Sequence, residues 1–182
     1  MGHPGGVPSR KPGEGRYAHL EREQRWLLRS MPSGLIEPRQ LHDRYLIGTR
    51  FRLRRVDAPN EQVFKLTQKV RSDPDSAERV RLTNTYLSAK EYEVFLALPA
   101  TELAKTRWQS HLAGRPTSVD VFHGELDGLV LAEVELREDE DRLPMPEGVS
   151  ADVTDDDRFS GGALSRCSAD RLRSALVDML GP

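Results

Sequence analysis

Residues 50–70 read RFRLRRVDAPNEQVFKLTQKV, and this stretch decides the fold class. Basic and apolar residues alternate along Arg50–Val56 and, less strictly, along Gln62–Val70, with a turn-like DAPN between them. Alternation predicts β-strands, because successive side chains of a strand point to opposite faces of the sheet. We therefore expect a hairpin with one basic face and one largely apolar face.

The strand pattern continues in both directions along the chain. Further strands are predicted at His19–Leu28, Arg39–Ile47, Arg79–Leu87, Val119–His123 and Leu129–Arg137. Leu103–Leu112 fits either a strand or a helix. The connections are mostly of hairpin length, which favours an antiparallel sheet or barrel over a parallel sheet with crossover helices.

Two helices are predicted beside these strands. Ser88 and Glu91 have the spacing of a capping box, which indicates a helix over Ser88–Leu98. Leucines at helical spacing predict an amphipathic C-terminal helix over Ser168–Leu180. The expected class is α+β, mainly antiparallel β.

The length of 182 residues suits a single domain. We expect a flexible Gly- and Pro-rich leader over 1–16 and one domain over 17–182. The single cysteine, Cys167, excludes an internal disulfide framework and a multi-cysteine zinc site. No apolar run approaches the roughly 18 residues of a membrane span, and the leader has no hydrophobic stretch, so we expect a cytoplasmic protein without a membrane segment.

The net charge of −2 hides an asymmetry between the two halves of the chain. Residues 16–81 carry 15 Lys/Arg against 9 Asp/Glu, whereas residues 82–182 carry 10 against 19. The first half suits an anionic partner, and the second half offers carboxylates for a cation.

The charges lie in rows on single strand faces, and the opposite faces are largely apolar. Such a row is commonly a solvated surface. If about eight strands close into a barrel, however, the charged face becomes a lumen with room for one small ligand. A lumen rich in Arg and Lys is costly unless an anion enters it. Carboxylates at i, i+2 suit Mg²⁺ or Mn²⁺, and an anion with a hard divalent metal indicates polyphosphate chemistry.

The stretch EREQR, with Glu21, Glu23 and Arg25, resembles the ExExK signature of the CYTH domain family, the triphosphate tunnel metalloenzymes. The last signature position is arginine here instead of lysine. The resemblance spans about Tyr17–Leu180. It continues in order through Tyr45-Leu46, FRLRR, KLTQK, KTRW, VDVFHGELDGLVLAEVEL and VTDDDRFS.

The resemblance implies an eight-stranded closed tunnel with flanking helices, one mouth of which is closed by the C-terminal helix. It implies Mg²⁺ or Mn²⁺ as cofactor, with ligands among Glu21, Glu23, Asp120, Glu133 and Glu135. The implied catalytic residues are Glu21, Glu23 and Arg25. The implied substrate-binding residues are Arg52, Arg54, Lys65, Lys69, Arg81, Lys105 and Arg107.

The expected function is metal-dependent hydrolysis of inorganic tripolyphosphate or an organic triphosphate. One alternative is a class IV-type adenylate cyclase that converts ATP to cyclic AMP and pyrophosphate. A second alternative is a non-catalytic polyphosphate-binding module, although such a module has no use for two pairs of glutamates. Nucleic acid is not the expected partner, because few aromatic residues interleave with the basic ones. The sequence leaves a monomer and a homodimer open.

Overall fold

The computed structural model describes residues 11–72 and 78–180. Its strands are β1 (His19–Leu28), β2 (Ile36–Leu46), β3 (Phe51–Ala58), β4 (Glu61–Arg71), β5 (Arg79–Leu87), β6 (Ala100–Leu112), β7 (Arg115–Phe122), β8 (Val130–Glu135) and β9 (Val149–Asp152). Its helices are α1 (Ala89–Leu96), α2 (Gly161–Leu164) and α3 (Ala169–Leu180), with 3-10 turns η1 (Gly124–Leu126) and η2 (Asp157–Phe159). The ambiguous stretch Leu103–Leu112 is part of strand β6.

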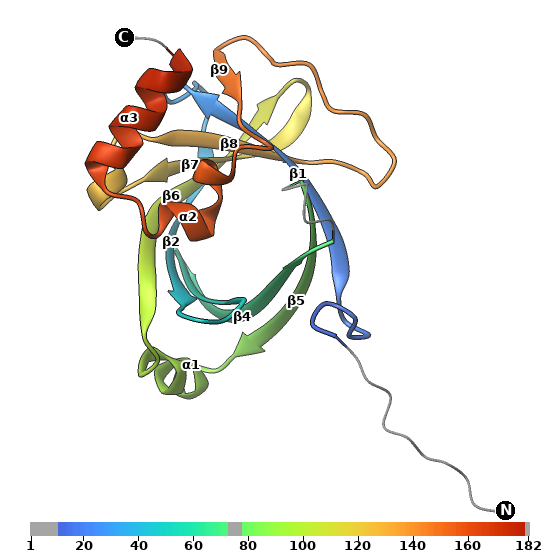
Figure 1. The fold of residues 1–182 in the computed structure, drawn as a ribbon, viewed down its shortest axis with the longest axis vertical. Helices are drawn as coiled ribbons and strands as arrows, with labels where there is room; N and C mark the ends of the chain where they lie inside the picture. Colours follow the sequence, from blue (N-terminus) through green and yellow to red (C-terminus); the bar gives the residue numbers. More distant parts are fainter. Residues whose placement is uncertain (1–10, 73–77, 181–182) are drawn as a thin grey trace, which may run out of the picture.

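The strands form a closed antiparallel barrel, seen as a ring in Figure 1. Their order is β5-β4-β3-β2-β6-β7-β8-β1, and β1 pairs with β5 to close the ring. Strand β1 pairs with β5 through His19–Arg22 and with β8 through Glu23–Leu28. The short β9 adds to the second half of β1, which β5 leaves uncovered. The predicted eight-stranded tunnel is confirmed, and β9 is an addition that the sequence did not predict.

Helix α1 covers the outside of the barrel next to β4 and β5. Its N-cap is Ser88, whose hydroxyl accepts from the Glu91 N–H at 3.3 Å, while the Glu91 carboxylate accepts from the Ser88 N–H at 2.7 Å. The predicted capping box is therefore confirmed. The ring of Tyr92 packs on Phe64 of β4 with centroids 4.6 Å apart, which fastens the helix to the sheet.

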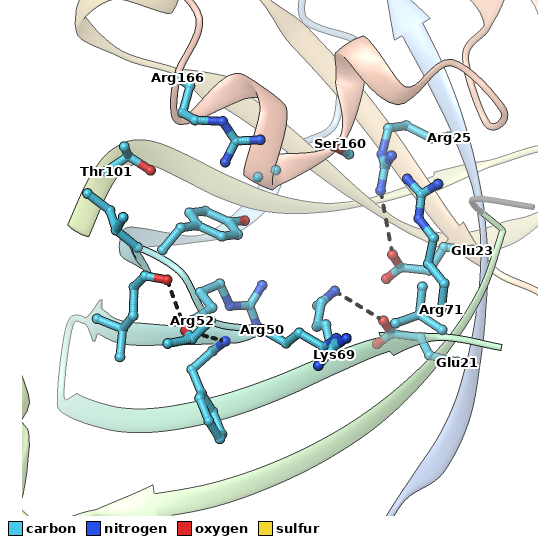
Figure 2. Close-up of a pocket in the computed structure, with 18 of the residues that line it drawn as sticks. Glu21, Glu23, Arg25, Arg50, Arg52, Lys69, Arg71, Thr101, Ser160 and Arg166 are labelled. Carbon is cyan, nitrogen blue, oxygen red and sulfur yellow. Dashed lines mark hydrogen bonds and ion pairs between the residues drawn. The ribbon is translucent and has the colours of Figure 1, made fainter. Parts of the chain in front are cut away.

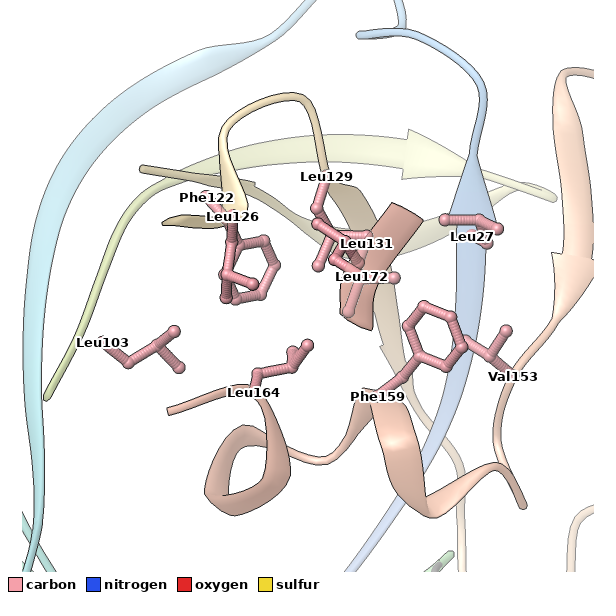
Figure 3. Packing of buried hydrophobic residues seen from close by; sticks show 10 residues of the cluster. All are labelled: Leu27, Leu103, Phe122, Leu126, Leu129, Leu131, Val153, Phe159, Leu164 and Leu172. Carbon is pink, nitrogen blue, oxygen red and sulfur yellow. The ribbon is translucent and has the colours of Figure 1, made fainter. Parts of the chain in front are cut away.

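The C-terminal segment packs against the barrel through a buried apolar cluster (Figure 3). Phe159 of η2, Leu164 of α2 and Leu172 of α3 join inward-facing residues of the strands, including Leu27 and Leu131. The predicted C-terminal helix is confirmed as α3. One part of the barrel interior is thus closed by apolar packing, and the rows of polar side chains line the rest of the interior.

A second buried cluster lies on the other face of β1, β7 and β8, beneath the loop that follows β8. It consists of Trp26, Leu28, Val119, Val130, Ala132 and Val134. Arg22 holds this loop, because its guanidinium donates to the carbonyls of Arg137, Glu138 and Glu140 at 2.7–3.0 Å. The side chain is only 8% exposed, so this outward-facing arginine is an anchor rather than a solvated charge.

The predicted leader over 1–16 falls partly outside the described residues, which begin at 11. Residues 11–16 form turns, and Gly13 lies at φ +86° against Val70, where a Cβ would meet the valine at 3.1 Å. Among the described residues, no helix has both the length and the apolar character needed to cross a membrane.

Candidate active site

The charged strand faces point into the barrel. Residues that pair directly across two antiparallel strands lie on the same face of the sheet. Arg54 pairs with both Asp43 of β2 and Lys65 of β4, and Arg25 pairs with Glu133 of β8. Arg54 is only 7% exposed, so this basic row lies inside and not on a solvated surface.

Two buried aspartates neutralise much of the basic lining. Asp43 accepts two hydrogen bonds from the Arg54 guanidinium at 2.5 and 2.6 Å. Asp120 accepts two from Arg107 at 2.6 Å and is also paired with Lys105. Both aspartates are 1% exposed. Burial alone would raise the pKa of each, but the neighbouring cations outweigh it and hold both pKa values below the usual range.

Glu133 extends this network toward β1. Its carboxylate accepts from Arg25 Nε at 2.9 Å and from Arg107 at 2.5 Å. Burial opposes ionisation, yet the two guanidinium groups hold the pKa of Glu133 well below its ordinary value. The interior network therefore runs from Arg25 through Glu133 and Arg107 to Asp120.

A cavity of about 510 Å³ lies at the barrel mouth where the β2–β3 turn meets β1 and α2 (Figure 2). Predicted site residues on its lining are Glu21, Glu23, Arg25, Arg52 and Lys69. Further lining residues include Tyr45, Arg50, Arg71, Thr101, Thr154, Ser160, Gly161, Gly162 and Arg166. Lys69 Nζ lies 3.5 Å from a Glu21 oxygen, and Arg25 lies 3.8 Å from Glu23. The cavity thus combines carboxylates with an excess of cations.

Glu23 is the most perturbed carboxyl group of this cavity. Burial, followed by repulsion from Glu133 and Glu21, raises its pKa from 4.5 to about 7, although Lys69 and Arg25 act in the other direction. The crowding of Glu23 by these two carboxylates therefore helps to keep it protonated up to near-neutral pH. Such crowding is relieved by an added cation or by protonation.

Two features of the basic wall favour an anion. Arg52 is 9% exposed, and among the described residues its buried Nε has no hydrogen-bond acceptor. Burial and the nearby charge of Arg52 lower the pKa of Lys69. A ligand oxygen with negative charge would satisfy the Arg52 donor and raise the pKa of Lys69 again.

The remaining predicted residues do not reach this cavity. Arg54, Lys65, Lys105, Arg107, Asp120 and Glu133 face the barrel interior but are not on the cavity lining. Lys65 is four residues from Lys69 along β4, or about 13 Å. Burial, then the charges of Arg54 and Arg52, lowers its pKa to about 8.

Two predicted residues lie apart from the others. Arg81 pairs with Val70, so it shares the outer face of β4 and β5 and is exposed. The expectation that Arg81 faces the substrate is thus corrected, since Leu82, its neighbour, is the inward residue opposite Lys69. Glu135 pairs with Glu23 and shares its face, but it is exposed at the end of β8 and is not on the cavity lining.

Several site residues were missed by the sequence analysis. Asp43 lies in a predicted strand, and its place in the alternation with Tyr45 could have identified it as inward-facing. Ser160 and Arg166 come from the segment between β9 and α3, for which the sequence predicted no structure. No periodic signal marks them, although Ser160 is the last residue of the VTDDDRFS block that carries part of the family resemblance.

The carboxylates suit a divalent cation in chemical type, because hard cations prefer oxygen ligands. In the arrangement seen, Lys69 lies beside Glu21, and Arg25 contacts both Glu23 and Glu133. Within the described ranges, no three carboxylate, histidine or cysteine side chains lie close enough together to hold an ion. Binding a metal through Glu23 and Glu133 together therefore requires Arg25 to move.

The sequence matches no family model and has no significant match among curated proteins. The structure is similar to the crystal structure of the inorganic triphosphatase NE1496, with a TM-score of 0.55 and 26% sequence identity over 81% of this chain and 95% of the other. A second crystal structure, of the hypothetical protein NE1496, gives a TM-score of 0.55 and 22% identity over 81% and 99% of the two chains. The latter supports the fold alone.

Proposed function

Because the chain has the closed tunnel fold of the CYTH type, we propose that it hydrolyses a triphosphate with the help of a divalent metal ion. The substrate is inorganic tripolyphosphate or an organic triphosphate. The observation that carries the proposal is the single cavity in which Arg25, Arg52 and Lys69 lie together with Glu21 and Glu23.

The basic residues and the glutamates of this cavity each meet one requirement of phosphoryl transfer. The transferred group and its leaving group are both anionic, so catalysis depends on positioning and charge neutralisation. Arg52 and Lys69 supply donors for the phosphate oxygens, and Arg25 adds a guanidinium beside them. A pure anion-binding module would have no use for Glu21 and Glu23.

In the proposed reaction, the oxygen of a water molecule attacks the terminal phosphorus. The bond from that phosphorus to the bridging oxygen breaks, and the electron pair leaves with the shortened chain. One proton of the water is released. A Mg²⁺ or Mn²⁺ ion, held by Glu21 and Glu23 when bound, would neutralise charge on the phosphate oxygens. Arg52 and Lys69 orient the chain so that its terminal group lies beside these carboxylates.

Hydrolysis is favoured over cyclisation by the similarity to a structure named as an inorganic triphosphatase. A cyclase also needs a surface that binds adenine and a group that activates the ribose 3′-hydroxyl. The lining residues offer many hydrogen-bond donors for phosphate oxygens, and few groups that would be specific for the adenine base. We therefore keep the cyclase as an outcome of the test and not as a second proposal.

The test is a substrate panel of tripolyphosphate, pyrophosphate, thiamine triphosphate and ATP, each with Mg²⁺, with Mn²⁺ and with EDTA. We expect phosphate release from a triphosphate that stops in EDTA, without cyclic AMP. Glu21→Gln should require more metal for half-maximal rate, because it removes one ligand charge. Glu93→Gln, on the exposed side of α1, is the control. The proposal would be refuted if cyclic AMP is formed, or if none of the triphosphates releases phosphate.

A further inference from the structure

Two arginines on the cavity lining have no acidic partner. Arg50 lies in the turn between β2 and β3, and Arg166 follows α2. Among residues 11–72 and 78–180, neither side chain makes a hydrogen bond or an ion pair. The other cations of the lining differ, since Arg25 contacts Glu133 at 2.9 Å and Lys69 contacts Glu21 at 3.5 Å. Arg71 pairs with Asp157, and Arg52 lies 3.9 Å from an Asp43 oxygen. The positive charge of the lining that has no acidic partner among the described residues is therefore that of Arg50 and Arg166.

The backbone that carries Arg166 is fastened to the barrel. A Cβ on Gly161 would lie 2.0 Å from the Tyr45 hydroxyl, so α2 approaches this ring as closely as glycine allows. The Ser165 hydroxyl is 2.7 Å from that of Thr101, and Leu164 is 3% exposed in the apolar core. Arg166 itself is exposed, but the backbone that carries it is held in place by these contacts.

The glutamates and Arg166 lie on opposite sides of the cavity, and Arg25 and Arg71 lie on the side of the glutamates (Figure 2). Figure 2 shows Glu21 and Glu23 on one side, Arg166 with Thr101 on the other, and Lys69 between them. Arg50 lies at the level of Lys69, since its carbonyl accepts from the Lys69 N–H at 3.0 Å. A linear phosphate chain whose reacting end lies beside the glutamates therefore runs past Arg50 toward Arg166.

We propose that Arg50 and Arg166 bind the end of the chain farthest from the reacting phosphorus, and that they select substrates with a free phosphate at both ends. The inference rests on the proposed function and names its substrate class as inorganic polyphosphates of three or more units. An unesterified terminal phosphate has one more ionisable oxygen than a phosphate that carries an ester. Two guanidinium groups can each bind such a group through paired hydrogen bonds. A nucleoside or thiamine ester at that end loses part of this interaction.

The experiment compares steady-state kinetics on tripolyphosphate and on ATP for the wild type, Arg50→Ala, Arg166→Ala and the double variant. For tripolyphosphate, each single change should raise KM about tenfold and leave kcat within about twofold, as expected for lost charge-assisted hydrogen bonds. For ATP, KM should change by less than about threefold. Arg173→Ala, an exposed arginine of α3 that pairs with Asp170, should change neither value.

A second measurement separates this inference from the proposed function. The rise in melting temperature caused by tripolyphosphate reports binding without catalysis. The double variant should lose most of that rise, and Arg173→Ala should keep it. Equal losses of kcat/KM on the two substrates, or an unchanged melting shift in the double variant, would overturn the inference. If the wild type hydrolyses none of the triphosphates in the panel described above, the proposed function is wrong, and the melting shift alone decides whether Arg50 and Arg166 bind polyphosphate.

Discussion

Glu23→Gln should stabilise the metal-free protein at neutral and alkaline pH. Burial and the charges of Glu133 and Glu21 raise the pKa of Glu23 from 4.5 to about 7. The folded state therefore holds this proton more tightly than the unfolded state does. Its contribution to stability is fully present below pH 4.5 and is lost as the pH rises through about 7.

The size of the effect follows from the shift. At about 1.4 kcal/mol per pH unit, a rise of about 2.5 units corresponds to about 3 kcal/mol. The Glu23 side chain is 25% exposed, so solvent screens it only in part. Glutamine has nearly the shape of protonated glutamate and does not ionise. The free energy of unfolding of Glu23→Gln should equal that of the wild type near pH 4.5 and exceed it by about 3 kcal/mol near pH 8.

The assay is urea denaturation in EDTA at several pH values between these limits, followed by circular dichroism. Glu93→Gln serves as the matched control, because Glu93 is exposed on α1 and far from the carboxylate cluster. Its difference from the wild type should stay within about 0.5 kcal/mol at every pH. A Glu23→Gln difference that does not grow with pH, or that has the opposite sign near pH 8, would show that burial and the charges of Glu133 and Glu21 do not raise the pKa of Glu23.

Three other experiments test the cavity and the interior network. Gly161→Ala should cost about 1–3 kcal/mol of stability by urea denaturation, since its Cβ would lie 2.0 Å from the Tyr45 hydroxyl, and adding Tyr45→Phe should recover most of that loss; no loss in the single variant would contradict the contact. Asp43→Asn should lower the free energy of unfolding by about 3–5 kcal/mol in the same assay, because Arg54 is then buried without a charged partner. A loss no larger than that from breaking an exposed ion pair would refute the role of Asp43. Tripolyphosphate at a hundredfold excess over Kd should raise the wild-type melting temperature by roughly 5–10 °C, and Arg52→Ala should lose most of this rise; a full rise in the variant would show that Arg52 does not bind phosphate.

The inward faces of most strands were predictable from the sequence. Alternation along a strand is a property of the backbone, so Glu23 and Arg25 share a face once the strand is recognised. The same holds for Arg52 with Arg54. In β5 the rule failed, because RVRLTNTYL has polar residues on both faces and the parity cannot be read from the pattern. The pairing of Leu82 with Lys69 places Arg81 outside.

The segment between β9 and α3 was not predictable in this way. Strand β9 has four residues and forms only because the second half of β1 has a free edge there. Helix α2 has the sequence GGAL, which has little intrinsic helix propensity. It is held by the Ser160 hydroxyl, which accepts from the Ala163 N–H at 3.3 Å, and by its contact with Tyr45. Tertiary contacts therefore decide where Ser160 and Arg166 lie.

The family resemblance assigned Arg54, Lys105 and Arg107 to phosphate binding on the basis of residue type. Residue type does not reveal which acidic side chain each of these basic side chains already pairs with. Arg54 is bound by Asp43 through two hydrogen bonds, and Arg107 is bound by Asp120 in the same way. A phosphate that displaced either aspartate would leave a buried carboxylate without its counter-ion, which is a large cost. Arg52 is held less tightly, because its Nε lies 3.9 Å from an Asp43 oxygen and has no hydrogen-bond acceptor among the described residues. We therefore infer that the binding energy for a triphosphate comes chiefly from the tunnel mouth, and that the interior ion pairs hold the basic strands in the positions from which Arg52 can act.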